Sequence, residues 1–315
     1  MKRWPRFTSP LYLSLLGGIF VLQACGTLGS EQGGGANLPN RGIAPYEKMR
    51  FDESPFLIES TTEQLISGPS AHVRKGVLEL YFVSSSASGE TCVMRRSSDP
   101  SFVFSDAECV LRLTDAPAWV GGSMGSPSLA HDGMEWWMAL AVNDGDTIAL
   151  IPGGDGSSFD WTRASQAWSA PEGSTLQTPS LVWDEDRFLL FVGRAGEIER
   201  ASGLPEVGFQ SDGVILAPDN TCDSSDCWDG EWLGEPDVRR ALGGDGTTVY
   251  RMFYTAGLSG KRDIGFAASY DGLTWTRYGR NPVISDGPEE RDPSQVLFDG
   301  SYYLFFMEYR AAGNS

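Results

Sequence analysis

Residues 235–256, EPDVRRALGGDGTTVYRMFYTA, contain the unit from which the rest of the chain is built. The unit opens with a proline followed by Ser or Asp, continues through a Gly-containing turn, and ends in a strand rich in aromatic and β-branched residues. Four more segments share this form, and the prolines are spaced by 58, 52, 57 and 57 residues: Pro69, Pro127, Pro179, Pro236 and Pro293. Repeats of this period are typical of solenoids and propellers.

Each complete unit is predicted to carry four strands. In the unit quoted above, the second strand is VYRMFYTA, the third covers residues 263–269, and the fourth contains Trp275. A side chain–backbone turn at Ser269, Asp271 and Gly272 is expected to join the last two strands. Antiparallel units repeated around a channel form a β-propeller, whose closure hides the sheet edges. We therefore expect an all-β fold, a five-bladed β-propeller of four-stranded antiparallel blades.

The last of the five units is incomplete. Only two strands follow Pro293 before the sequence ends. Residues 46–67 are predicted to supply an outer strand, because Ser54-Pro-Phe-Leu57 resembles Asn281-Pro-Val-Ile284. One strand is still missing, and the sequence leaves two explanations open, a last blade that is short or a truncated gene product.

The N-terminal residues have the features of a bacterial lipoprotein signal peptide. Lys2, Arg3 and Arg6 precede an uncharged apolar run, Leu11–Leu22, which is shorter than the roughly 20 residues of a transmembrane helix. The run ends in Leu22-Gln23-Ala24-Cys25, which resembles the lipobox of bacterial lipoproteins. The resemblance implies that Cys25 is lipidated and becomes the mature N-terminus. An ordinary secretory signal with a chance cysteine is the alternative.

These features divide the chain into three parts. Residues 1–24 are the lipoprotein signal peptide, residues 25–40 are a flexible Gly-rich tether, and residues 41–315 form the propeller. We expect a cell-envelope protein, attached to the outer membrane or the cell surface through the lipid on Cys25. The formal net charge of −18 becomes more negative by three when the leader is removed, because the leader carries three basic and no acidic residues. This charge argues against nucleic acid as a partner.

Four cysteines remain beyond the lipidated one, as expected for disulfides in an oxidising compartment. Three pairings exist, and closeness in sequence favours two local pairs: Cys92–Cys109 and Cys222–Cys227. The wide cysteine spacing does not resemble a zinc site, and the chain has only two histidines, His72 and His131. We therefore predict no metal and no cofactor, and we do not expect either histidine to be a catalytic base.

Residues 264–294 carry a family resemblance. The stretch Ile264-Gly-Phe-Ala-Ala-Ser-Tyr-Asp-Gly-Leu-Thr-Trp275, followed by Asn281-Pro-Val-Ile284 and Arg291-Asp-Pro-Ser294, is similar to the five-bladed propeller glycosidases. These include glycoside hydrolase family 43, invertases, levansucrases and mannoside phosphorylases, and the resemblance covers about Ile43 to the C-terminus. It implies a glycan or polysaccharide partner. For family 43 it also implies Asp, Asp and Glu at the channel ends of three successive blades.

The chain departs from that pattern of acids. The first three units begin with Gly68, Ser126 and Thr178, none of which is acidic. Glycoside hydrolysis needs one carboxyl group to protonate the leaving oxygen and another to activate water or attack the sugar. Carboxylates occur at the channel end only in the last two units, so the candidate catalytic residues are Asp292, Glu235 and Asp237.

Candidate substrate-binding residues flank these acids: Trp228, Trp232, Arg239 and Arg291. The two tryptophans lie in or beside the acidic loop of the Cys222–Cys227 pair, where they could stack on sugar rings, although half-buried packing is the common alternative. The structural alternative for the acids is that Glu235 and Asp292 pair with Arg239, Arg240 or Arg291 and hold neighbouring blades together.

Three functions remain open. The incomplete set of acids favours a membrane-anchored extracytoplasmic lipoprotein that binds carbohydrate on a glycosidase-like propeller whose catalytic acids are degenerate. The first alternative is an active glycoside hydrolase that acts on a polysaccharide through Glu235 and Asp292. The second alternative is a protein-binding scaffold of the cell envelope.

Overall fold

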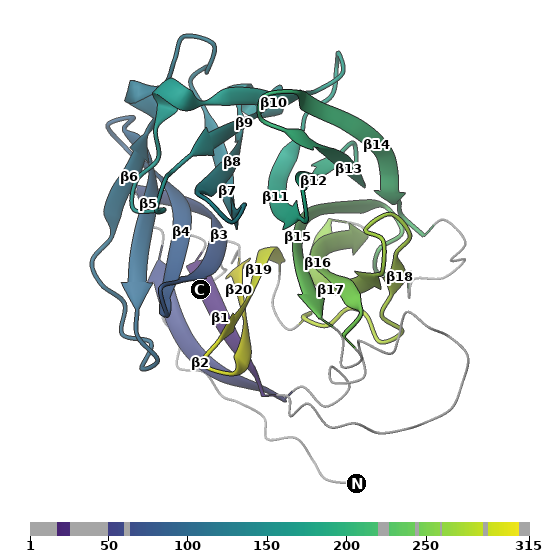
Figure 1. Ribbon diagram of the computed structural model, residues 1–315. Helices are drawn as coiled ribbons and strands as arrows, with labels where there is room; N and C mark the ends of the chain where they lie inside the picture. The colour runs from purple at the N-terminus through teal and green to yellow at the C-terminus, as the bar shows by residue number, and fades with distance from the viewer. Residues whose placement is uncertain are drawn as a thin grey trace, which may run out of the picture.

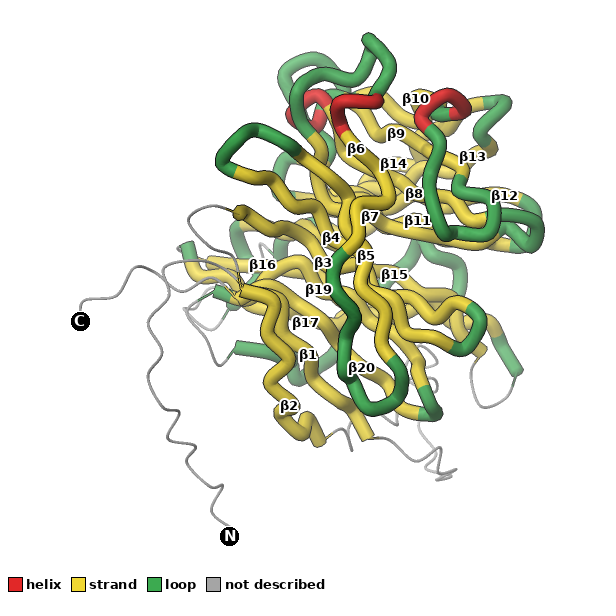
Figure 2. The backbone as a smooth tube through the Cα atoms, turned by 90° about the vertical axis from the view of Figure 1, so that its left-hand side faces the viewer, coloured by secondary structure: helices red, strands yellow, loops and turns green. Residues whose placement is uncertain are grey.

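The computed structural model describes residues 18–25, 50–59, 64–219, 227–242, 246–258, 260–285 and 289–308, with side chains from Ile66 onward. The predicted all-β class is confirmed, because the strands form four-stranded antiparallel sheets around a common axis (Figure 1). The three described 3-10 helices, red in Figure 2, are η3 (Leu113–Asp115), η4 (Asn143–Gly145) and η5 (Trp161–Arg163).

Four blades are each built from one continuous stretch of chain, with their strands in sequence order. The first contains β3 (Gln64–Arg74), β4 (Val77–Ser86), β5 (Thr91–Ser98) and β6 (Glu108–Arg112). The second contains β7 (Met124–His131), β8 (Trp136–Val142), β9 (Thr147–Pro152) and β10 (Ser165–Ser169). The third contains β11 (Gln177–Asp184), β12 (Arg187–Arg194), β13 (Glu197–Leu204) and β14 (Gly208–Leu216). The fourth contains β15 (Trp232–Leu242), β16 (Thr248–Leu258), β17 (Lys261–Ser269) and β18 (Thr276–Arg277).

A further sheet is assembled from both ends of the chain, in the order β19 (Glu290–Phe298), β20 (Ser301–Glu308), β1 (Gly18–Cys25) and β2 (Arg50–Glu59). As expected, the segment before the first repeat supplies the outer strand, β2. Strand β1 fills the place for which the sequence analysis found no strand, and it pairs antiparallel with both β20 and β2. This strand is the end of the predicted signal peptide. Because no side chain of β1 or β2 is described, the count of five blades stays a prediction.

The first strand of every sheet lies at the axis. Strands β3, β7, β11, β15 and β19 are neighbours in a closed ring, in which β19 also contacts β3 (Figure 1). The same position in each repeat therefore comes to the same level of the channel, which is what brings the candidate site residues together.

The apolar cores lie between neighbouring sheets, so most strands are buried on both faces. In β4, Leu78 and Leu80 pack toward the sheet of β20, whereas Tyr81 and Val83 pack toward the second blade. A strand that is buried on both faces reads as a continuous apolar run instead of an alternating one. This double burial explains why each second strand of the repeat is recognisable in the sequence.

The predicted turn between the third and fourth strands of the fourth blade is confirmed. Ser269 Oγ accepts hydrogen bonds from the N–H groups of Asp271 and Gly272. Asp271 Oδ1 in turn accepts one from the Thr274 N–H at 2.7 Å. Trp275 donates its indole N–H to the Gly272 carbonyl, so these residues close the turn and build no site.

The first of the two predicted disulfides is also confirmed. Cys92 and Cys109 are bonded and join β5 to β6, the two outer strands of the first blade. Cys227 is disulfide-bonded as well. Its predicted partner, Cys222, lies outside the described residues, so that pairing stays a prediction.

Candidate functional site

The residue before each repeated proline lies at the axis, and we call these five residues the pre-proline ring: Gly68, Ser126, Thr178, Glu235 and Asp292. Each first strand has a register shift at this place. Such β-bulges turn side chains in a new direction and are frequent beside active sites. The backbone φ angle is positive at Thr178 (39°), Glu235 (50°) and Asp292 (50°), a conformation that is uncommon for residues other than glycine.

The pre-proline ring converges on the axis. The Thr178 hydroxyl donates to Asp292 Oδ1 at 3.3 Å, although the two residues belong to sheets that are not neighbours. The Asp292 N–H donates to Glu235 Oε2 at 3.1 Å. On the other side of the ring, a Cβ atom added to Gly68 would lie 1.8 Å from Ser126 Oγ. The ring therefore has two carboxyl groups on one side and no room for a further side chain on the other.

Glu235 and Asp292 form a coupled pair of buried carboxyl groups. Their exposed fractions are 8% and 7%. Burial raises the pKa of Glu235, against the opposing charge of Arg291, whose Nη1 lies 3.9 Å from Glu235 Oε1. Burial and then the charge of Glu235 raise the pKa of Asp292 well above its ordinary value. Because two close carboxylates disfavour double ionisation, the pair titrates as a unit.

Asp237 has a different place from these two acids. It stands where the other repeats carry a serine after the proline. Three of these serines accept hydrogen bonds across blade boundaries, from Leu181 N–H to Ser128, Val238 N–H to Ser180, and Ala71 N–H to Ser294. Asp237 Oδ2 accepts the equivalent bond from the Gln295 N–H at 2.9 Å. Asp237 therefore links β15 to β19 in the same way as the serines link other sheets.

Arg239 also links the sheets. Its guanidinium lies 3.0 Å from Asp237 Oδ1 and donates to the carbonyls of Ala71 at 3.3 Å and Gln295 at 3.2 Å, so it bridges three sheets across the axis. Next to it, Ser70 Oγ and His72 Nε2 are 3.0 Å apart. Burial, followed by the charge of Arg239, holds the pKa of His72 well below 6.5. Arg239 thus links sheets through Asp237, and not through Glu235 or Asp292 as the structural alternative expected.

Of the other two arginines named in the structural alternative, only Arg291 approaches one of the two acids. Arg291 approaches Glu235 and makes an ion pair with Glu289, with its side chain 34% exposed. Arg240 pairs instead with Asp184 at 3.1 Å, on the neighbouring blade. Arg291 is therefore the cation that belongs to the pre-proline ring.

The two candidate stacking tryptophans are largely covered. Trp228 packs against Tyr254, with ring centroids 5.7 Å apart, and a Cβ atom at Gly265 would lie 2.2 Å from the Trp228 ring. The Arg262 guanidinium lies over the Trp232 ring at 4.5 Å. These contacts support the packing alternative for Trp228, and they leave Trp232 with an arginine on its face.

Sequence reasoning missed Thr178 as a partner of the acids. The signal was present, because Thr178 occupies the same repeat position as Glu235 and Asp292, but its contact with Asp292 depends on ring closure. Cys25 ends β1, and its side chain lies outside the description. Among the described residues there is no group of three or more His, Cys, Asp or Glu side chains that could hold a metal ion. No described helix is long and apolar enough to cross a membrane.

The fold is a propeller similar to that of family-43 glycoside hydrolases. A thermostable family-43 glycoside hydrolase superposes with a TM-score of 0.57 at 16% identity, over 78% of this chain and 90% of the other. An endo-1,4-beta-xylanase from Bacteroides thetaiotaomicron gives 0.61 at 17% identity, over 79% and 87%. A GH43_1 enzyme from Xanthomonas citri in complex with xylotriose gives 0.54 at 17% identity, over 78% and 82%.

These similarities are in the fold alone, since the identities are low. No family model matches the sequence. No curated protein sequence matches it significantly.

Proposed function

We propose that this chain is an exported, lipid-anchored protein that binds carbohydrate on a five-bladed propeller of the glycosidase type, without hydrolysing it. Support for the ligand class comes from the similarity in fold to glycoside hydrolases, one of which is described in complex with xylotriose. Support for the anchor comes from the leader and the lipobox-like tetrad that ends at Cys25.

The incomplete set of acids in the pre-proline ring carries the proposal that hydrolysis is absent. Retaining and inverting glycosidases need two carboxyl groups that are free to act on the glycosidic oxygen and on water or the sugar. Here Glu235 accepts the main-chain N–H of Asp292, and Thr178 holds the Asp292 carboxyl from across the axis. The other ring positions, Gly68 and Ser126, supply no further acid.

One observation favours hydrolysis as the second candidate. A general acid needs a raised pKa, and the pKa of both Glu235 and Asp292 is raised by burial. In that case one of the two would protonate the leaving oxygen while the other activates water.

A paired assay of turnover and binding separates these functions. The purified full chain is incubated with aryl xylosides, aryl arabinofuranosides, xylan and arabinan, new reducing ends are measured, and binding is recorded on a glycan array. We expect glycan binding without new reducing ends. Glu235→Gln and Asp292→Asn should weaken binding, whereas the exposed control Glu185→Gln should not.

Two outcomes would change the conclusion. Hydrolysis that falls by about 10²–10⁴-fold in Glu235→Gln or Asp292→Asn, without a change in melting temperature, would establish the enzyme instead. A protein that neither binds nor cleaves any glycan but captures an envelope protein would support the scaffold.

A further inference from the structure

A cavity of about 470 Å³ lies between the first two blades, at the far ends of their axial strands. Its wall contains Arg74, Lys75, His131, Met134, Trp136 and Asp155. Gly68 and Arg74 are six residues apart on β3, which corresponds to about 20 Å along a strand, so the cavity is well removed from the pre-proline ring. The volume lies within the range of small-molecule sites, roughly 300–1,000 Å³.

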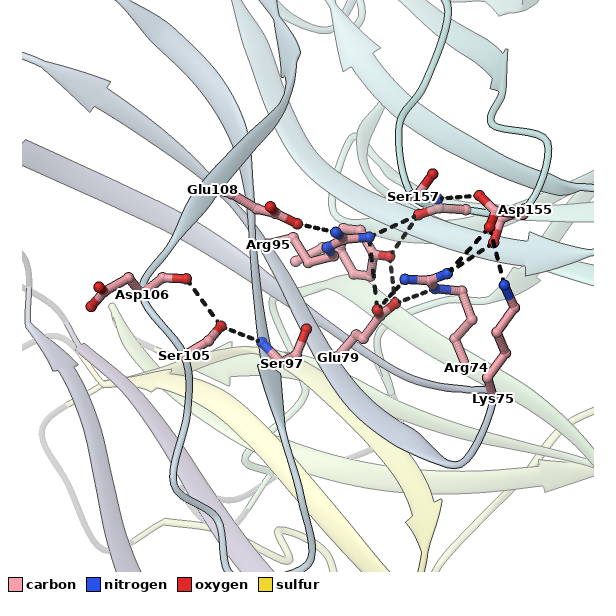
Figure 3. A network of polar contacts seen from close by, with 12 residues as sticks. Arg74, Lys75, Glu79, Arg95, Ser97, Ser105, Asp106, Glu108, Asp155 and Ser157 are labelled. Atoms are coloured by element: carbon pink, nitrogen blue, oxygen red, sulfur yellow. Dashed lines mark hydrogen bonds and ion pairs between the residues drawn. The ribbon is translucent and has the colours of Figure 1, made fainter.

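The charged side of the cavity consists of ion pairs that make further hydrogen bonds to neighbouring groups. Arg74 donates to both oxygens of the buried Glu79, at 2.8 and 2.5 Å, and to the main-chain carbonyl of Asp155 (Figure 3). Lys75 Nζ lies 3.1 Å from Asp155 Oδ2, and the Ser157 N–H donates to Asp155 Oδ1. The charges of this wall are therefore balanced, and it presents an exposed ammonium group beside an exposed carboxylate.

The aromatic side of the cavity is specific to the second blade. Trp136 is half-buried at the start of β8 and meets His131 edge to face, with ring centroids 5.3 Å apart. Met134 beside it is 91% exposed. The same register position in the other sheets carries no aromatic residue: Val77, Arg187, Thr248 and Ser301. The propeller repeat does not require a tryptophan there.

We propose that this cavity is a second carbohydrate-binding site, which takes a neutral saccharide through Trp136 and the Lys75–Asp155 pair. The apolar face of a sugar ring packs against an aromatic ring, and its hydroxyl groups need both donors and acceptors, which the ammonium and carboxylate groups supply. The balanced charges disfavour an anionic ligand over a neutral one. The inference shares the ligand class of the proposed function but uses none of its residues.

Isothermal titration of the full chain in a detergent without sugar groups tests the site, with xylohexaose, cellohexaose and arabinohexaose as neutral probes and hexagalacturonate as the anionic probe. We expect at least one neutral hexasaccharide to bind, and Trp136→Ala to weaken that binding at least tenfold. Asp155→Asn, a smaller change, should also weaken it even if Trp136→Ala proves unstable. Thr248→Ala, at the matching register of the fourth blade, is the control and should leave binding unchanged.

The double variant Glu235→Gln/Asp292→Asn separates this site from the pre-proline ring. Binding that survives in the double variant and is lost in Trp136→Ala supports the second site, whatever the ring does. The inference is overturned if no neutral hexasaccharide binds at millimolar concentration, if hexagalacturonate alone binds, or if binding is lost only in the double variant.

Discussion

Gly68 and Ser126 occupy the same repeat position as Glu235 and Asp292, yet the two sides of the ring differ in size and charge. On one side the small residues pack so closely that no side chain fits at Gly68. On the other side the two acids meet, held by Thr178 and Arg291. An acid at position 68, as in the family pattern, would overlap Ser126, so the departure of this chain from that pattern has a steric counterpart.

Replacement of Gly68 by alanine should therefore destabilise the protein beyond the cost of its backbone conformation. We expect Gly68→Ala to lower the free energy of unfolding by about 1–3 kcal/mol through overlap with Ser126, as other overpacked cores do. Gly76→Ala is the control, because Gly76 also has a positive φ, of 78°, but open space around its Cβ position. Urea unfolding of both variants measures the difference, and equal losses would contradict the overlap.

The coupled acids predict a pH dependence. The pKa of Asp292 is raised in the folded protein, so the folded state holds a proton there more tightly than the unfolded state does. Ionisation of Asp292 therefore lowers the free energy of unfolding at neutral pH. This cost is relieved as the pH falls through the raised pKa toward about 4, the value in the unfolded chain. The lowered pKa of His72 acts in the opposite direction, but it is common to wild type and variant.

Asp292→Asn should thus be most stable relative to wild type at neutral pH, and this advantage should shrink as the pH is lowered to about 4. Melting temperatures of the two proteins between pH 8 and pH 4 test this expectation. The exposed control Asp106→Asn should show no such trend. A difference between Asp292→Asn and wild type that is constant with pH would refute the raised pKa.

At the level of elements, the residue after each repeated proline explains how the sheets hold together. Ser128, Ser180, Asp237 and Ser294 each accept a main-chain N–H from the next sheet. These bonds are buried, where an unmade hydrogen bond costs roughly 1–3 kcal/mol. The residue after the repeated proline therefore helps to close the ring, and the pre-proline position remains free for chemistry.

The disulfide of the first blade should contribute to stability through its loop. Cys92 and Cys109 are 17 residues apart, and a loop of this size is expected to stabilise the folded state by about 3 kcal/mol. The double variant Cys92→Ala/Cys109→Ala should lose about that much in urea unfolding under oxidising conditions. A reductant should destabilise the wild type more than the variant, which keeps the disulfide of Cys227. Identical wild-type curves with and without reductant would contradict this.

For the molecule as a whole, the fifth sheet uses a segment that the proposed export would remove. Strand β1 joins β20 to β2, but it is also the end of the predicted signal peptide. Removal of residues 1–24 would take nearly all of this strand out of its sheet. The strands of the four continuous blades would all remain, but the cores that the first and fourth blades share with β19 and β20 would border a sheet that has lost a strand.

The lipoprotein proposal predicts which of these forms is found in the envelope. Mass spectrometry of the membrane-extracted protein should find lipid-modified Cys25 at the N-terminus, and labelled palmitate should be incorporated. Cys25→Ser should abolish the label, because acylation needs the thiol. A mature protein that still contains residues 18–24, unlabelled, would contradict the proposal and would leave β1 in its sheet.

The sequence by itself determined the features that depend on neighbouring residues. The turn at Ser269 and the Cys92–Cys109 pair each join two neighbouring strands. The repeat and the all-β class were visible in the apolar runs of the second strands, which are buried on both faces. The pre-proline position of Glu235 and Asp292 was visible for the same reason, since it repeats along the chain.

Only the tertiary structure decided what those positions do. The contact of Thr178 with Asp292 joins residues that are 114 positions apart in the sequence. The contact of Arg239 with Ala71 spans 168 positions. Such contacts form because the ring closes. The repeat spacing predicts the closure, but it does not specify which side chains then meet. Closure also turned Asp237 into a link between sheets and brought Trp136 to the cavity between the first two blades.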